Sequence, residues 1–268
     1  MGWVSRLRGW FSEGSLPDED SRQWMLTAWQ WLWANDPLPA HLHSAPLIWP
    51  SAEDFPLTTP EDPERARQVF GMVKGHAGMA GWRCALQAQP VDVTAQLRDA
   101  GVYVDGGSGD PGGTFSVSAK GPLITYAPDF CEDLSVLIAV LAHEVGHLRL
   151  ATVRAGRPGG PEMEEPLTDL CAIAMGFGIF LANTAVIERT HGDGLFKGWS
   201  LSTSGYLSAR ERAFALALFS ETHRLDPQPI ACHLDANPKR AYRSAVQHIR
   251  HHHGHRLPTM KSVSWNDL

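Results

Sequence analysis

Three polar side chains stand in an apolar stretch of the sequence, VLIAVLAHEVGHLRLATV at residues 136–153. They are His143, Glu144 and His147, and together they form the pattern HExxH. In a helix this spacing places both imidazoles on one face, one turn apart, so that both can reach a single metal ion. Glu144 is rotated by about 100° from them and can approach a water molecule on that ion. The pattern predicts a zinc site, with hydrogen bonding alone as the alternative way to satisfy these groups.

A catalytic zinc ion needs a third protein ligand and an open position for water. The extension HExxHxxGxxH is excluded, because Leu150 stands at the glycine position and Val153 at the third histidine. The other known scheme takes a glutamate from the next helix, with an acid four residues later. Among the glutamates that follow, only Glu165 has such an acid, Asp169. Glu165 is therefore the predicted ligand, and Asp169 is expected to fix the tautomer of His143.

These motifs carry a resemblance to a known family. HEVGH followed by EPLTD, read as ExxxD, resembles the gluzincin branch of zinc metallopeptidases, the thermolysin-like arrangement. Most of the chain is also similar to a group of uncharacterised bacterial HExxH proteins. The first resemblance implies a zincin-like α+β fold, with a small β-sheet before the HExxH helix and a mainly helical C-terminal half.

The same resemblance implies an activity and further site residues. It implies hydrolysis of peptide bonds in a peptide or protein substrate, by a metal-bound water that Glu144 deprotonates before passing the proton to the leaving amine. An edge strand should align the substrate backbone, and PLITYA at residues 122–127 is the expected segment. A histidine or tyrosine should stabilise the oxyanion. Tyr206 and His223 are the candidates, with a structural hydrogen bond as the alternative for each.

Two helices must position the ligands. A helix is expected from about residue 130 to residue 154, because Asp129 followed by Glu132 is typical of a capping box. The helix that carries Glu165 should begin no earlier than about Glu162, because Pro166 is tolerated only in the first turn. Gly146, which costs the first helix up to about 1 kcal/mol, indicates close approach by another segment.

Other elements are expected around these two helices. The spacing of apolar residues predicts an aromatic-faced helix at 21–34 and a short helix at 63–78. Alternation predicts a strand within 82–89, and residues 101–126 are β-rich. There we expect one strand at 101–107, and then GTFSVS and PLITYA as a hairpin or as two neighbouring strands.

Two helices are expected in the C-terminal half. One is capped by Ser208 with Glu211, and the other by Asn237 with Pro238 at its first position. The stretch HIRHHHGH at residues 248–255 is expected to be a solvated basic tail, with metal binding as the alternative.

The whole chain limits the classes of function. Its 268 residues, 43% apolar, carry a formal charge of -6, which gives no basic field for nucleic acid. We expect no membrane span, because no apolar stretch of the sequence reaches the roughly 20 residues that span a bilayer. The N-terminus lacks the features of a signal peptide, and four separated cysteines favour a reducing compartment, so we expect a cytoplasmic protein.

We expect residues 1–95 to form a Trp- and Pro-rich helical extension packed on a metallopeptidase domain at 96–268. The leading hypothesis is a zinc metallopeptidase. One alternative is a regulatory or interaction protein that binds zinc in a zincin-like fold without turnover. The other is a structural helix pair whose histidines and acids only form hydrogen bonds.

Overall fold

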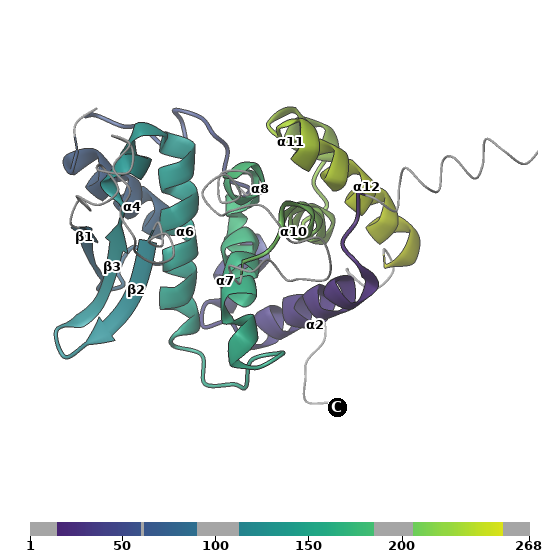
Figure 1. Ribbon diagram of the computed structural model, residues 1–268, viewed down its shortest axis with the longest axis horizontal. Helices are drawn as coiled ribbons and strands as arrows, with labels where there is room; N and C mark the ends of the chain where they lie inside the picture. The colour runs from purple at the N-terminus through teal and green to yellow at the C-terminus, as the bar shows by residue number, and fades with distance from the viewer. Residues whose placement is uncertain (1–14, 60–61, 90–112, 185–205, 254–268) are drawn as a thin grey trace, which may run out of the picture.

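A computed structural model of the chain describes residues 15–59, 62–89, 113–184 and 206–253 (Figure 1). The fold is mixed α+β, mostly helical with a small three-stranded sheet, so the predicted α+β class is confirmed. The strand expected at 101–107 and the domain boundary expected at residue 95 lie outside the described residues.

The N-terminal part is helical. α2 (Glu19–Asn35) begins after Asp18, whose Oδ1 accepts a hydrogen bond from the backbone N–H of Ser21. Its buried side chains include Trp29 and Trp33, which confirms the aromatic-faced helix, two residues longer at its start than expected. α3 (Pro39–Ser44) and α4 (Glu64–His76) follow, and α4 confirms the short helix predicted at 63–78.

The sheet contains β1 (Ala85–Ala88), β2 (Gly113–Ser118) and β3 (Gly121–Tyr126) in the order β1-β3-β2. β1 pairs with β3 in parallel, and β2 pairs with β3 as an antiparallel hairpin. Of the two arrangements expected for GTFSVS and PLITYA, the structure therefore has the hairpin. The expectation that PLITYA forms the edge strand is wrong, because β3 has a strand on each side. Of the described strands, β2 is the edge strand beside the HExxH helix, with which it is in contact.

α6 (Leu134–Leu150) carries the HExxH pattern and lies between the sheet on one side and the helices of the C-terminal half on the other (Figure 1). Its predicted start is wrong. Residues Pro128–Glu132 form a separate 3-10 turn, η1, and Asp133 is the N-cap, accepting from the backbone N–H of Ser135 at 2.8 Å. Asp133 is extended, with φ -113° and ψ 109°, so the chain changes direction between the two segments. The helix ends at Leu150 rather than near residue 154.

The segment that carries Glu165 begins with a 3-10 turn, η2 (Pro161–Met163), and continues as α7 (Glu164–Ala172). This agrees with the expected start, since Pro166 falls in the first turn of α7. A π-helical stretch, η3 (Ile173–Phe177), then leads into α8 (Gly178–Thr184). The interruption falls at Gly176, whose φ is 105° and where a Cβ atom would lie 2.2 Å from the backbone oxygen of Pro46.

Taken together, the helical run Pro161–Thr184 is 24 residues long and apolar enough to cross a membrane by length and composition. This run is longer than the sequence indicated. However, 94% of its apolar window is buried inside the fold, as in the core helix of a globular protein, so it is weak evidence for a membrane span.

Three helices complete the described fold: α10 (Ala209–Thr222), α11 (Pro227–Cys232) and α12 (Ala236–His252). The capping box of Ser208 and Glu211 is confirmed at the start of α10. The cap expected at Asn237 is wrong. Asp235 occupies the N-cap position, so Pro238 lies in the first turn of α12, where a missing backbone N–H costs little.

The buried apolar residues form one cluster, to which α2, α6, α7, α8, α10 and α12 all contribute. A buried ion pair crosses it. Arg149, at the end of α6, donates from Nε and Nη2 to the two carboxylate oxygens of Asp36 at 2.7 and 2.6 Å. Its Nη1 donates to the backbone oxygen of Ala77 at 2.8 Å. The HExxH helix is thus fastened to the segments that follow α2 and α4.

Candidate metal centre

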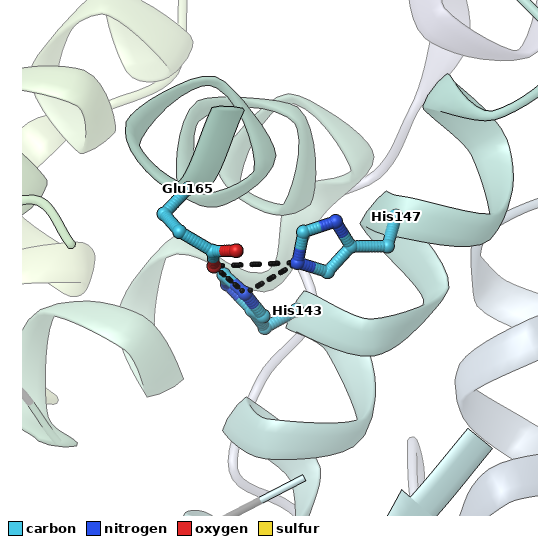
Figure 2. Close-up of side chains that lie close together, drawn as sticks. All are labelled: His143, His147 and Glu165. Atoms are coloured by element: carbon cyan, nitrogen blue, oxygen red, sulfur yellow. Dashed lines mark hydrogen bonds and ion pairs between the residues drawn. The ribbon is translucent and has the colours of Figure 1, made fainter. Parts of the chain in front are cut away.

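The structure brings His143, His147 and Glu165 together (Figure 2). Nε2 of His143 lies 3.1 Å from Nε2 of His147 and 3.0 Å from Oε2 of Glu165. The third side of this triangle, from Nε2 of His147 to Oε2 of Glu165, is 3.3 Å. The two histidines come from adjacent turns of α6 and the glutamate from the first turn of α7, so the group spans both helices.

These separations suit a metal ion. With bonds of about 2.0–2.1 Å, tetrahedral geometry places neighbouring ligand atoms roughly 3.3–3.4 Å apart. The observed triangle is slightly smaller, so an ion would need only small movements of the three side chains. The side chain of Glu165 is 37% exposed, against 9% for His143, so the group is accessible from the side of Glu165.

The hydrogen bonds behind His143 determine where its lone pair points. Nδ1 lies 2.9 Å from Oδ1 of Asp169, as the sequence predicted. Asp169 is buried, and its Oδ2 accepts from the backbone N–H of Leu207 and from Nε of Arg212, both at 3.0 Å. Burial raises the pKa of Asp169, but Arg212 and His143 outweigh this and hold it below its ordinary value. An ionised Asp169 can only accept, so His143 donates from Nδ1.

His147 is held in the same way by Thr168. The Thr168 hydroxyl donates to the backbone oxygen of Glu164 at 2.9 Å, which uses its only proton. Its oxygen is therefore left to accept from Nδ1 of His147, 3.3 Å away. Nothing in the sequence pattern indicated this contact, although Thr168 directly precedes Asp169.

With both histidines donating from Nδ1, two Nε2 lone pairs and a carboxylate oxygen converge on one position. Such a set needs a cation. Without a metal ion, a proton on His143 supplies the positive charge. Burial lowers the pKa of His143, but hydrogen bonds to Asp169 and Glu165 outweigh burial and raise this pKa to about 10. The same histidines hold the pKa of Glu165 well below its usual range, against the effect of its own burial. The residues fit a divalent ion, which would replace that proton.

Glu144 follows His143 directly on α6 but is not part of the ligand triangle. It is only 3% exposed, and its Oε2 has no hydrogen-bond partner among the described residues. Burial raises the pKa of Glu144, and the nearby histidines only partly offset this. Its Oε1 lies against β2, where a Cβ atom on Gly113 would approach it to 2.9 Å. A buried carboxylate with an unused oxygen is suited to accept a proton.

The edge strand β2 also reaches the ligands. Phe115 stacks parallel to the ring of His147, with 6.2 Å between the centroids. Gly113 and Phe115 are two residues apart, so they lie on the same face of the strand. The strand pattern of residues 113–118 was expected, but it did not assign Gly113 or Phe115 to the site, because β-strand alternation alone does not identify the neighbouring helix.

Tyr206 and His223, the two oxyanion candidates, lie in different places. The ring of Tyr206 packs on His143 at a centroid distance of 5.0 Å. His223 follows the last turn of α10 and packs on Phe219 and Trp33. α10 begins beside Asp169 and places His223 roughly 20 Å further along its axis. His223 is therefore excluded as a partner of the metal group, because the helix that carries it runs away from the site.

The close approach expected at Gly146 is confirmed. A Cβ atom there would lie 3.0 Å from Cγ2 and 3.1 Å from the backbone oxygen of Thr168. The glycine therefore lets α7 approach α6 at the level of the ligands. The histidine-rich stretch lies elsewhere: His248 and His252 contact one another on α12, with ring centroids 4.5 Å apart, and His255 is outside the described residues.

No protein-family model matches the chain, and no curated protein sequence or solved structure matches it either. The fold and the site therefore define an α+β protein with a group of three side chains that could hold a metal ion.

Proposed function

We propose that this protein is a zinc-dependent metallopeptidase with a zincin-like fold, acting on a peptide or protein substrate. The observation that carries the proposal is the pairing of two features. Three ligand atoms converge within hydrogen-bond distance of one another, and the buried carboxylate of Glu144, with one oxygen unused, comes from the same helix. Two histidines and one glutamate form a ligand set found at catalytic zinc sites.

The roles of the chain's own residues follow from their positions. His143, His147 and Glu165 would hold zinc, which when bound polarises a carbonyl and lowers the pKa of water. Glu144 accepts a proton from the attacking water at its unused Oε2 and donates it to the leaving amine. Its raised pKa suits both steps, because such a carboxyl group binds and releases a proton nearer to neutral pH.

Substrate alignment falls to β2. This strand pairs with β3 on one side only among the described strands, so its other edge can pair with an extended peptide. Gly113 lies against Glu144 and Phe115 against His147, so a peptide along that edge would pass close to both. Tyr206, whose ring packs on His143, is the residue proposed to donate to the oxyanion.

The proposal is tested by zinc analysis and by Glu144→Gln. We expect purified protein to contain close to one zinc ion and to cleave members of a mixed-peptide library. Glu144→Gln should keep the zinc, since Glu144 is not in the ligand triangle, and should lose cleavage by at least about 100-fold. Product formation is followed by mass spectrometry.

Each outcome decides between the alternatives. Equal cleavage by wild type and Glu144→Gln would remove the role of Glu144. Stoichiometric zinc without cleavage would favour the zinc-binding protein without turnover, and protein without zinc would favour the hydrogen-bonded helix pair.

A further inference from the structure

Arg212, on the first turns of α10, is a buried arginine that the metal centre does not use directly. It is 2% exposed. Its Nε donates to Oδ2 of Asp169 at 3.0 Å, and its Nη1 donates to the backbone oxygen of Leu181 at 3.4 Å. It therefore connects α10 to α7 and to α8.

Asp169 stands between this arginine and the metal centre. One of its oxygens accepts from Nδ1 of His143, and the other accepts from Arg212 and from the backbone N–H of Leu207. All three partners are nitrogen donors: His143 lies on α6, and Leu207 and Arg212 lie at the start of α10. The carboxylate is thus held from two sides, and its orientation determines how the His143 ring is turned.

The same contacts place Tyr206. This residue directly precedes Leu207, whose N–H is tied to Asp169, and its ring packs on His143. One carboxylate therefore fixes the direction of a ligand lone pair and the entry of the chain into α10.

We propose that Arg212 is a positioning residue for the metal centre, which acts through Asp169 to aim Nε2 of His143 at the position shared with His147 and Glu165. The inference rests on the metal centre proposed above. It goes beyond that proposal because it assigns a role in metal affinity to a residue that contacts no ligand of the ion.

A second buried arginine provides a matched control. Arg149 is also fully buried and paired with a buried carboxylate, that of Asp36. The remaining hydrogen bond that Asp36 accepts comes from the backbone N–H of Leu38, so its carboxylate does not orient His143 or His147. Loss of Arg149 should therefore disturb the fold to a similar degree without turning His143.

The experiment compares wild type with Arg212→Met, Arg212→Lys, Arg149→Met and Arg149→Lys. Zinc affinity is measured by competition with a chromophoric chelator, on proteins whose folding is checked by near-UV circular dichroism. The visible spectrum of the cobalt-substituted proteins reports the ligand geometry. Changes to residues that orient metal ligands typically weaken metal affinity by about 10–100-fold, and we expect a loss in this range for Arg212→Met.

Arg212→Lys should lose less, because lysine keeps the charge beside Asp169 but not the guanidinium geometry. Both Arg149 variants should melt at lower temperature yet bind zinc within about twofold of wild type, a difference too small to reflect a turned ligand.

Zinc affinity and a cobalt spectrum like those of wild type in folded Arg212→Met would overturn the inference. Equal losses in the Arg212 and Arg149 variants would overturn it as well, since they would indicate a general effect of destabilisation. If Arg212→Met does not fold, the zinc affinity of Arg212→Lys is the deciding measurement, and an affinity equal to that of wild type contradicts the proposal. Wild-type protein that binds no zinc would remove the metal centre itself, which is a different failure.

Discussion

At the scale of single residues, each histidine of the proposed metal centre has an oxygen atom of α7 beside its Nδ1. Asp169 accepts from His143, and Thr168 accepts from His147. Because Thr168 and Asp169 are adjacent, a small rotation of α7 would disturb both contacts at once. The two oxygens differ in charge, so we expect the carboxylate to contribute more to metal affinity than the hydroxyl.

Thr168→Val tests the weaker of these contacts. Valine keeps the shape of the side chain but leaves Nδ1 of His147 without its acceptor, so zinc affinity should fall by about tenfold. Thr184→Val is the control, because the buried Thr184 hydroxyl donates only to backbone oxygens of its own helix, those of Phe180 and Leu181. Chelator competition measures both variants, and equal affinities would show that Thr168 does not orient His147.

The choice of Glu165 as ligand is tested against its neighbour. Glu164 is paired with Arg157 at 2.5 Å and does not belong to the group formed by His143, His147 and Glu165. We expect Glu165→Ala to lower the zinc content of the purified protein by at least about tenfold, because two histidines alone hold zinc weakly. Glu164→Ala should retain it. Plasma emission spectrometry gives the zinc content, and the reverse result would mean that Glu164 is the ligand.

At the scale of elements, the site depends on how closely α6 and α7 approach. Gly146→Ala would place a methyl group against the backbone of Thr168, which cannot move without shifting α7. We expect a loss of about 1–3 kcal/mol in the free energy of unfolding, because overpacking outweighs the gain in helix propensity. Zinc affinity should fall as well, since the two ligand-bearing helices separate.

Gly71→Ala is the matched control on α4. A Cβ atom there meets nothing within 4 Å, so the substitution should stabilise the protein by about 0.5–1 kcal/mol and leave zinc affinity unchanged. Urea unfolding measures both variants. A Gly146→Ala protein as stable as Gly71→Ala would mean that the helices can adjust without cost.

Prediction from the sequence succeeded where a local pattern determined the contact. His143 and His147 share a helix face as their spacing indicated, because a helix fixes which residues lie on one side. Their meeting with Glu165 and Asp169 was expected from the resemblance to gluzincins. Prediction failed where two acidic residues could cap the same helix. Asp129 and Asp133 both precede helical sequence, and Asp133 is the N-cap of α6. It also failed for the order of strands and for Arg212, because pairing across the sheet and burial between helices leave no periodic signal in the chain.

At the scale of the whole molecule, the charged groups that would hold the metal ion also contribute to the stability of the fold. In the zinc-free protein, burial alone would lower the pKa of His143, but hydrogen bonds to Asp169 and Glu165 raise it to about 10, above the ordinary value of 6.5. The protonated ring of His143 therefore contributes to the stability of the zinc-free fold, and this contribution is at its maximum below about pH 6.5, the ordinary pKa of histidine. This contribution is lost progressively as the pH rises towards 10.

Zinc needs the unprotonated Nε2 of His143, so it must displace this proton. The rise in melting temperature caused by zinc should therefore be small near pH 6 and should grow as the pH increases towards about 9. At the pH where the zinc concentration reaches about 100 times the apparent dissociation constant, the stabilisation is about 2.7 kcal/mol, or roughly 5–10 °C for a chain of this size. Thermal unfolding with excess zinc and with a chelator, across this pH range, measures the difference. Glu165→Ala should show little of it, and a zinc effect in wild type that does not change with pH would contradict the exchange of proton for metal.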